Sequence, residues 1–423
     1  MERVLSNELK PGMRAKVKGW VDHVRNLGNI RFLTIRDREG IIQVTAKKSD
    51  VPEEVFGMIS DLGKEDCIEI EGEVVKSRIA KTGLEIIPTS LKVLAGSEKP
   101  LPLEFSGKIE SGKDTRFEYR YLDLRNPEVR KIFVIRHKVV GLMHEFFRKN
   151  GFIEIQTPVI QAAGAEGGAT LFKVDYYGKE AFLRQSPQLY KQMMMASGLD
   201  KVYEIGQAFR AEKFHTRRHI SEFLSLDFEM AWIESEEDVM RTLERMVVYV
   251  LKGLKKETDL RLKVPELPFK RFTYDYVLKT LEKVGVEIEW GEDIEDAQEK
   301  KFAELMAKKG YEAYFITKFP SKIKPFYIMQ DGEISRGIDL DYRGLELASG
   351  GQREHRYEVL VNVIKQKGLD PKDFAFYTNA FRWGMPPHGG IGFGVDRFVK
   401  QILDLPDVQE AILFPRTPEK LIP

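Results

Sequence analysis

The sequence has almost none of the features that mark secreted, membrane-spanning or zinc-binding proteins. Among its 423 residues there is one cysteine, Cys67, so neither an internal disulfide nor a cysteine zinc site can form. No apolar run approaches the ~18 residues that span a bilayer. Charged residues stand within the first four positions, where a secretory signal would lead into an apolar core. These absences predict a protein of the reducing cytoplasm without a membrane partner.

An excess of charge of either sign is also lacking. Lys and Arg together number 67 and Asp and Glu 66, which gives a net charge of +1. Such a chain does not bind nucleic acid through bulk positive charge, so any RNA-binding site must be a local patch. The length exceeds that of one compact core, and we expect two or three domains.

The amino-terminal part, residues 1–103, has the pattern of a small β-barrel. Alternating or β-branched segments separated by glycines predict five short strands, at residues 15–20, 31–36, 41–45, 67–75 and 84–87, with a helix at 53–62 between the third and the fourth. This is the layout of an OB-fold, a common reader of single-stranded nucleic acid. A barrel without a ligand is almost equally compatible with the pattern.

The rest of the chain divides into a connector and a larger domain. Pro100 and Pro102 disfavour both helix and strand pairing and predict a stiff link. Beyond it we expect a charged hinge at residues 104–130 and a second domain at 131–423. Residues 235–320 are rich in Lys and Glu and predict a mostly helical insertion that decorates this domain without taking part in chemistry.

Three segments of the second domain stand out. Residues 209–219 carry three arginines and two histidines between two strand-like segments, an arrangement suited to hold a polyanion such as a nucleotide triphosphate. A solvated basic turn is the ordinary alternative for such a loop. Residues 389–397 are glycine-rich and end in Arg397. A helical pattern at 127–149 leads into a strand that closes at Pro158.

Together these three segments resemble the three signature motifs of class II aminoacyl-tRNA synthetases. Residues 185–192 and 345–353 are similar to those of the aspartyl-tRNA synthetases of archaeal and eukaryotic type, and the resemblance covers the whole chain. It implies an α+β multidomain fold, with an amino-terminal five-stranded OB-fold barrel that binds the anticodon and a class II catalytic domain built on an antiparallel sheet flanked by helices. It also implies an enzyme that uses ATP to join L-aspartate to tRNA.

The resemblance assigns ATP to the basic loop and the glycine-rich segment. Arg210 is expected to grip the α-phosphate and Arg397 the terminal phosphates, because a guanidinium binds phosphate oxygens bidentately and neutralises the charge that develops during transfer. These two arginines are the expected catalytic residues. The other residues implied in ATP binding are Glu212, Arg218, His219, Ile220, Glu346, Gly394, Val395 and Asp396.

The segment around Tyr342-Arg343 predicts a hairpin, because apolar and polar residues alternate on both sides of it. A two-residue turn there would set Asp339 directly opposite Glu346. Two carboxylates so close repel unless a cation lies between them, and Mg²⁺ held by carboxylate and phosphate oxygens suits that place. The alternative is a pair of acids that face solvent. The resemblance supports the metal site and adds Ser349 to it.

For aspartate, the resemblance implies six binding residues: Glu166, Gln188, Lys191, Arg210, Ser349 and Arg353. The glutamate lies in a glycine-rich loop that closes over the amino acid and meets its ammonium group. Lys191 and Arg353 are expected to hold the side-chain carboxylate, since burial of that charge is tolerable only where cations meet it. A lysine that merely extends from a helix into solvent is the alternative. The sequence departs from the family at Ala165, where threonine is commoner, and at Phe214-His215.

The barrel is expected to bind tRNA(Asp). Phe32 would stack on an anticodon base and Gln43 would read a base edge, although packing of Phe32 in the barrel core explains it equally well. Charging of tRNA(Asn) stays open, because Lys81 matches enzymes that accept both tRNAs whereas Asp22 stands where relatives carry Trp or His. The family also implies a homodimer, and the apolar helix face within residues 127–158 offers a self-complementary surface for it.

Three alternative functions were weighed against the aspartate enzyme. An asparaginyl-tRNA synthetase shares all three motifs, but a neutral amide substrate gives no reason to bury the ammonium group of Lys191. A non-catalytic RNA-binding paralogue would be expected to lose Arg210, Glu346 or Arg397, and all three are present. A ligase that forms asparagine without tRNA would lack the amino-terminal barrel.

Overall fold

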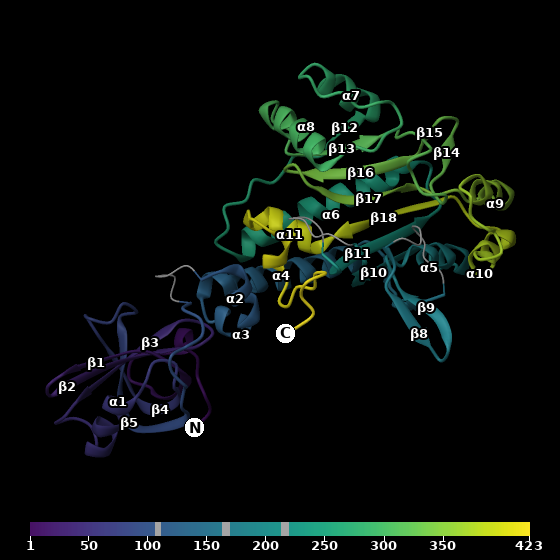
Figure 1. The fold of residues 1–423 in the computed structure, drawn as a ribbon. Helices are drawn as coiled ribbons and strands as arrows, with labels where there is room; N and C mark the ends of the chain where they lie inside the picture. Colours follow the sequence, from purple (N-terminus) through teal and green to yellow (C-terminus); the bar gives the residue numbers. More distant parts are fainter. Residues whose placement is uncertain (106–110, 163–169, 213–219) are drawn as a thin grey trace. The chain divides into compact units, whose positions relative to one another are not determined.

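The computed structural model describes residues 1–105, 111–162, 170–212 and 220–423. The chain divides into two compact units, Met1–Pro102 and Leu103–Pro423 (Figure 1). None of the helices in the described ranges is both long and apolar enough to cross a membrane.

The first unit is a closed five-stranded barrel. Its strands are β1 (Arg14–Leu27), β2 (Ile30–Arg36), β3 (Ile41–Lys47), β4 (Cys67–Lys76) and β5 (Leu84–Ala95), with α1 (Glu53–Asp61) between β3 and β4. The order around the barrel is β1-β2-β3-β5-β4. The predicted five-stranded OB-fold barrel is confirmed. The outer ends of β1 and β5 extend beyond the predicted strands, because their exposed residues pair without any apolar alternation to reveal them.

The second unit is built on an eight-stranded sheet. Its strands, in spatial order, are β12 (Lys270–Thr273), β13 (Ala313–Thr317), β16 (Gly337–Tyr342), β17 (Glu346–Gln352), β18 (His388–Gly394), β11 (Glu222–Ala231), β10 (Lys201–Phe209) and β6 (Ile153–Glu154). Neighbours run antiparallel except at the two ends, where β12 pairs with β13 and β6 with β10 in parallel. The predicted sheet flanked by helices is confirmed, with this mixed pairing at its edges.

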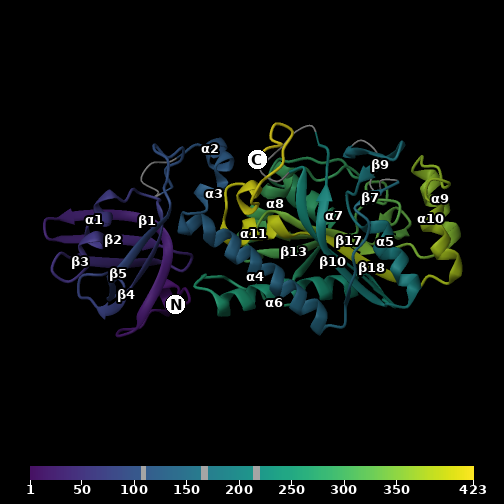
Figure 2. The same cartoon turned by 90° about the horizontal axis from the view of Figure 1, so that it is seen from below.

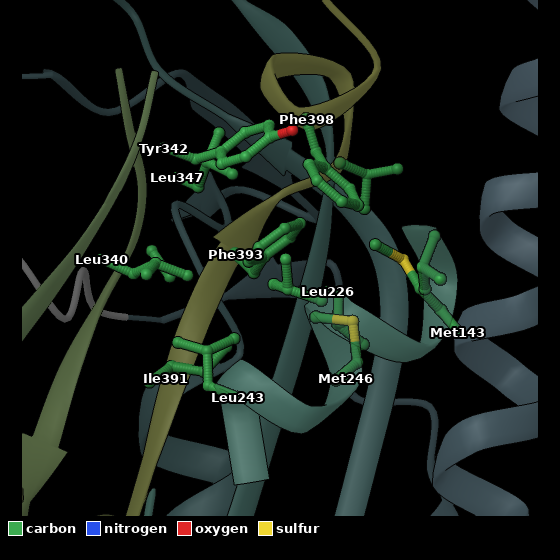
Figure 3. Close-up of a cluster of buried hydrophobic side chains, with 14 of the residues drawn as sticks. Met143, Leu226, Leu243, Met246, Leu340, Tyr342, Leu347, Ile391, Phe393 and Phe398 are labelled. Carbon is green, nitrogen blue, oxygen red and sulfur yellow. The ribbon is translucent and has the colours of Figure 1, made fainter. Parts of the chain in front are cut away.

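Two long helices, α4 (Pro127–Lys149) and α6 (Glu236–Glu257), cover one face of this sheet and lie side by side (Figure 2). The Asn126 side chain caps α4 by accepting from the Glu128 amide, and Ser235 begins α6 with a capping box. Figure 3 shows the core between helices and sheet, where Met143 and Met246 gather with Phe393. Helix α11 (Val395–Leu403) follows β18 directly.

The remaining elements are α2 (Lys113–Glu118), α3 (Arg120–Asp123), β7 (Ile160–Gln161), β8 (Lys173–Tyr176), β9 (Lys179–Leu183), α5 (Gln188–Met193), α7 (Tyr274–Glu282), α8 (Asp296–Lys308), β14 (Gln330–Asp331), β15 (Ile334–Ser335), α9 (Tyr357–Gln366), α10 (Ala375–Thr378) and the short 3-10 helices η1 (Ser6–Glu8), η3 (Met194–Ser197), η4 (Asn379–Trp383) and η5 (Val408–Ala411). Of these, η1 belongs to the first unit and the others to the second.

The region 235–320 differs from the helical insertion that its composition suggested. Helix α6 is part of the central core, and β12 and β13 are strands of the main sheet. Every residue of β13 is buried. A short strand that is buried on both faces shows no alternation of polar and apolar residues, so the sequence pattern did not distinguish it from the charged helical segments around it.

The expected hinge also contains fixed structure. Residues 113–123 form α2 and α3 within the second unit, and the guanidinium of Arg120 is fully buried. It lies 2.6 Å from Asp123 and 3.5 Å from Glu410 of η5. A buried ion pair needs a defined partner on both sides, so the carboxyl-terminal segment holds this connector in place.

Candidate active site

A cleft of about 910 Å³ opens over β11, β17 and β18. Ten of the predicted site residues line it: Gln188, Arg210, Glu212, Ile220, Glu346, Ser349, Arg353, Gly394, Asp396 and Arg397. Strand pairing explains how residues far apart in the chain meet there. Gly392 of β18 pairs with Ser349 of β17 on one side and with Asp227 of β11 on the other.

Two cations and two carboxylates, here called the cleft floor, are buried at the base of the cleft; Arg353 and Asp227 line it, and Lys191 and Glu229 pack against them. Lys191 of α5 donates to Asp227 Oδ1 at 2.9 Å and to the Ile391 carbonyl at 2.7 Å, and its Nζ lies 3.6 Å from Glu229 Oε2. Arg353 donates from Nε and Nη2 to the two oxygens of Glu229 at 2.9 and 3.2 Å. Lys191 and Arg353 are each 1% exposed, so the lysine does not extend into solvent.

These four side chains balance one another electrostatically. Burial by itself would raise the pKa of Glu229, but Arg353 and Lys191 outweigh it and hold that pKa below its ordinary value. Sequence reasoning missed Asp227 and Glu229. The available signal was in β11, where polar residues alternate with Leu226 and Phe228 although the strand is central and buried on both faces.

The glycines of β18 make room for these carboxylates. A Cβ at Gly390 would lie 2.0 Å from the Phe228 carbonyl and 2.3 Å from Glu229 Oε2. At Gly392 the nearest atom would be Asp227 Oδ1 at 3.3 Å. The glycine run was interpreted from sequence as a place where backbone approaches a ligand. In the structure these two glycines are crowded by the protein's own backbone and acids.

The hairpin of β16 and β17 corrects one prediction. Asp339 pairs with Ser349, and Glu346 pairs with Asp341, so Asp339 does not lie directly opposite Glu346. Two causes shift the register. The turn is centred on Arg343 and Gly344, both with positive φ, one residue later than predicted. An irregularity next to Leu340 shifts the pairing once more.

The two predicted metal-binding acids still influence each other. Burial in the protein around the cleft, followed by repulsion from Asp339, raises the pKa of Glu346 to about 7, although 43% of the Glu346 side chain is exposed to the cleft. Asp339 is neutralised by Lys324, whose ammonium lies 2.8 and 2.6 Å from its two oxygens. Lys324 is not among the site residues predicted from the sequence.

The two predicted catalytic arginines both line the cleft. Arg210 lies with its guanidinium carbon 5.6 Å from the centre of the Phe223 ring. Arg397 donates to the Glu346 carbonyl at 3.1 Å, and its Nη1 is 4.0 Å from Glu346 Oε1. Arg210 follows the end of β10 and Arg397 the end of β18, and both strands pair with β11 in the same direction, so the two cationic side chains line the cleft at the same edge of the sheet, where they can bind an anion such as a triphosphate.

Two residues expected to bind ATP have side chains that serve the fold. Val395 is fully buried in the core. The Asp396 carboxylate accepts from the Leu224 amide at 2.8 Å and from Arg136 Nε at 3.0 Å, and burial raises its pKa. Any contact of Val395 or Asp396 with a nucleotide therefore falls to the backbone.

The remaining predicted residues lie elsewhere. Glu166, Arg218 and His219 fall outside the described residues, as do Ala165, Phe214 and His215.

The residues expected to read the anticodon lie in the barrel. Phe32 of β2 is half-buried, while its neighbour Leu33 points into the core. Gln43 of β3 donates to Glu85 at 2.9 Å, and Lys81 is exposed in the turn before β5. The barrel core is filled without Phe32, which leaves the ring on the outer face.

Comparisons with known proteins agree over both units. Residues 112–418 match the family described as tRNA synthetases class II (D, K and N), and residues 15–94 match the OB-fold nucleic acid binding domain. The chain is 50% identical to an aspartate–tRNA(Asp) ligase of Pyrococcus abyssi, over 97% of both proteins. It is 46% identical to an aspartate–tRNA(Asp/Asn) ligase of Methanopyrus kandleri, over 98% of this chain and 97% of the relative.

Solved structures of the same kind superpose on the whole chain. The asparaginyl-tRNA synthetase of Pyrococcus horikoshii, complexed with asparaginyl-adenylate, has a TM-score of 0.92 at 34% identity and covers 100% of both chains. The aspartyl tRNA synthetase of Entamoeba histolytica has a TM-score of 0.88 at 30% identity, over 100% of this chain and 93% of the other. With its fold, its cleft and its sequence in agreement, the chain belongs to the class II tRNA synthetases of the D, K and N group.

Proposed function

We propose that this chain is an aspartate–tRNA ligase, which activates L-aspartate with ATP and transfers it to the 3′ end of tRNA(Asp). The observation that carries the proposal is a pair of buried cations at the cleft: Arg353 lines it, and Lys191 lies next to it, bonded to the lining residue Asp227. A dicarboxylic amino acid keeps one carboxylate after the other is committed to the phosphate. Two cations in a desolvated site suit that carboxylate. The 50% identity to curated aspartate–tRNA(Asp) ligases supports the same substrate.

Asparagine is the second candidate substrate, because a synthetase for it superposes on the whole chain. Its side chain ends in an uncharged amide, whose NH₂ group would face the donors of Lys191 and Arg353, donor against donor. A site built to hydrogen-bond one group rejects an analogue that lacks it by large factors. The buried cations therefore favour aspartate.

Class II synthetases use ATP as a substrate, and the residues that line the cleft suit the first half-reaction. Arg210 would hold the α-phosphate so that the aspartate carboxylate attacks it in line. Arg397 would hold the terminal phosphates that leave as pyrophosphate. Both act by position and charge, since this reaction needs little covalent help from the protein.

A magnesium ion in the cleft would be held partly by the carboxylate of Glu346 and partly by the phosphates of ATP, rather than by protein ligands alone. A carboxyl group whose pKa is raised to about 7 has an ionised form that gains from a nearby cation. In the described ranges no three His, Cys, Asp or Glu side chains lie together as a metal-binding group. Mg²⁺ commonly takes one or two protein ligands and completes its shell with phosphate and water. Glu346 and Ser349 would hold the ion, next to Asp339, the strand partner of Ser349. The ion would neutralise charge on the phosphates.

A homodimer is part of the proposal, although its surface differs from the one first expected. The apolar face of α4 is buried within its own unit and does not offer a self-complementary surface. Exposed apolar residues nearby, Val134, Ile153, Val159 and Ile160, are the better candidates. A monomeric mass by light scattering at micromolar concentration, with full activity, would contradict the dimer. Cytoplasmic location stays a prediction from the single cysteine.

The experiment that tests the function measures both half-reactions on the purified protein. ATP–pyrophosphate exchange should proceed with aspartate and be slower with asparagine by about a thousandfold or more. Charging of purified tRNA(Asp) and tRNA(Asn) with aspartate then decides whether one or both tRNAs are substrates. Exchange that is equal with the two amino acids would overturn the proposed specificity.

A further inference from the structure

Beneath the cleft floor lies a buried hydrogen-bond network, of which only Gln188 is among the residues predicted to bind aspartate. It consists of Gln188, Gln192, Tyr377 and His388, here called the Gln192 network. Gln192, Tyr377 and His388 are fully buried and Gln188 is 4% exposed. Of the four, only Gln188 lines the cleft.

The direction of every hydrogen bond in the Gln192 network follows from His388. Its Nδ1 lies 2.8 Å from the Pro386 carbonyl, which can only accept, so Nδ1 carries the proton. Burial lowers the pKa of His388 to about 4, so the ring is neutral and Nε2 is an acceptor. Gln192 Nε2 is 3.0 Å from that nitrogen and must donate to it.

The orientation of the Gln192 amide fixes that of the Gln188 amide, which lines the cleft. With its amide nitrogen turned toward His388, Gln192 presents Oε1 to Gln188 Nε2 at 2.7 Å and to the Tyr377 hydroxyl at 3.2 Å. Gln188 then presents Oε1 to Arg353, which donates from Nη2 at 3.2 Å. A flipped Gln188 amide would set its NH₂ against the guanidinium, donor against donor. Arg353 is thereby held between Gln188 and Glu229.

We propose that Gln192 and His388 are positioning residues for amino-acid selection, which lock the Gln188 amide so that Arg353 keeps one orientation toward the substrate carboxylate. The inference rests on the proposed function, in which Arg353 and Lys191 bind the aspartate side chain. Neither Gln192 nor His388 is among the residues that line the cleft. Their side chains reach Arg353 through Gln188, while the backbone of His388, which a side-chain substitution leaves in place, accepts from the Arg353 amide at 2.8 Å.

Two substitutions of Gln192 separate orientation from packing. Gln192→Met keeps nearly the same volume and removes all hydrogen bonds. Gln192→Glu keeps the shape, and as a buried neutral acid it donates from its hydroxyl to His388 and accepts from Gln188 at the other oxygen. Gln401→Met is the matched control, because Gln401 is a buried glutamine that bonds backbone carbonyls away from the cleft floor.

Each variant is assayed by ATP–pyrophosphate exchange with aspartate and with asparagine, alongside its thermal unfolding. Gln192→Met should raise the KM for aspartate about tenfold to a hundredfold and lower the aspartate-to-asparagine ratio of kcat/KM by a similar factor. The KM for ATP should stay within about twofold. Gln192→Glu should recover most of the loss, and Gln401→Met should change stability without changing either amino-acid parameter.

Equal tolerance of methionine and glutamate at position 192 would overturn the inference, because a packing role does not distinguish them. If Gln192→Met does not fold, His388→Leu removes the acceptor at the next step, and unchanged selectivity in that variant would overturn the inference equally. Lys191→Leu is included to distinguish failure of the positioning role from failure of the proposed aspartate recognition. Loss of aspartate activation in that variant with no effect at Gln192 would refute the positioning role alone, whereas full activity of Lys191→Leu would refute the proposed recognition of aspartate.

Discussion

Lys191 is 1% exposed, and its Nζ lies between Asp227 and Glu229. A desolvated ammonium is stable only because these carboxylates and the Ile391 carbonyl surround it. The same arrangement gives the residue its proposed role, since a substrate carboxylate entering the cleft adds one more negative charge beside it.

Lys191→Leu should therefore abolish aspartate activation with little change in the KM for ATP. Truncating one partner of a desolvated charge pair costs ~2–5 kcal/mol, or about 30-fold to several thousand-fold in kcat/KM for aspartate. ATP–pyrophosphate exchange at varied aspartate concentration measures it. Activation of aspartate within a few-fold of the parent would show that the assignment is wrong.

His388 makes a separate prediction about pH and stability. The folded protein keeps this buried ring neutral down to about pH 4, whereas the unfolded chain protonates it near its ordinary pKa of 6.5. Between these values the unfolded state binds more protons, so the free energy of unfolding falls as the pH is lowered through this window. From pH 7.5 to 5 the loss from this group should be about 2 kcal/mol.

Guanidinium unfolding at pH 7.5 and 5 of the parent and of His388→Gln isolates this contribution, because every other titrating group is shared. The variant should lose less stability on acidification than the parent by that amount. Parallel pH dependence in the two proteins would contradict a neutral buried His388.

At the scale of single elements, β18 shows how glycines within a strand can define a site. Gly390 pairs with Glu229, and Gly392 pairs with Asp227 and Ser349. Each glycine leaves open the space that a neighbouring carboxylate fills. The charges of the cleft floor come from β11, from α5 and from Arg353, which follows β17, and the glycines of β18 leave space for the carboxylates.

Gly390→Ala and Gly392→Ala form a matched pair on this strand. The added methyl at Gly390 would lie 2.0 Å from a backbone carbonyl that cannot move away, and the variant should lose ~1–3 kcal/mol of unfolding free energy together with aspartate activation. At Gly392 the contact of 3.3 Å with an acid side chain requires only a small shift. Denaturant unfolding and exchange assays should show the smaller effect there. Equal effects at both positions would argue against this steric account.

At the scale of the whole molecule, the two compact units divide the proposed work. The barrel core is complete without Phe32, so the exposed part of that ring is available for stacking on a nucleotide base. The cleft that would bind ATP and aspartate is lined by residues of the second unit alone.

Phe32→Ala should consequently weaken charging of tRNA(Asp) and leave ATP–pyrophosphate exchange unchanged. Stacking contributes ~1–3 kcal/mol per base, or about 5- to 150-fold in the KM for tRNA. Comparison of the two assays on one preparation measures this. An equal loss in both activities would instead indicate that Phe32 serves the packing of the barrel.

The sequence by itself determined the features that depend on local period and on chemistry along the chain. The five barrel strands show β-strand alternation, and α4 begins and ends at the predicted residues 127 and 149 because its cap and apolar spacing are local. The motif arginines Arg210 and Arg397 were also predicted from the sequence, since a basic loop and a glycine-rich segment can be recognised without knowledge of the fold.

Only the tertiary structure decided which residues meet. The pairing of Asp339 with Ser349 depends on a turn and an irregularity that shift the register. The partners of Lys191 and Arg353 come from β11, a strand whose acids have no marker in the chain to link them to α5 or β17. Strand pairing and burial are set by long-range contacts, which no local pattern records. The charge balance of the cleft floor was therefore decided by how the strands pair.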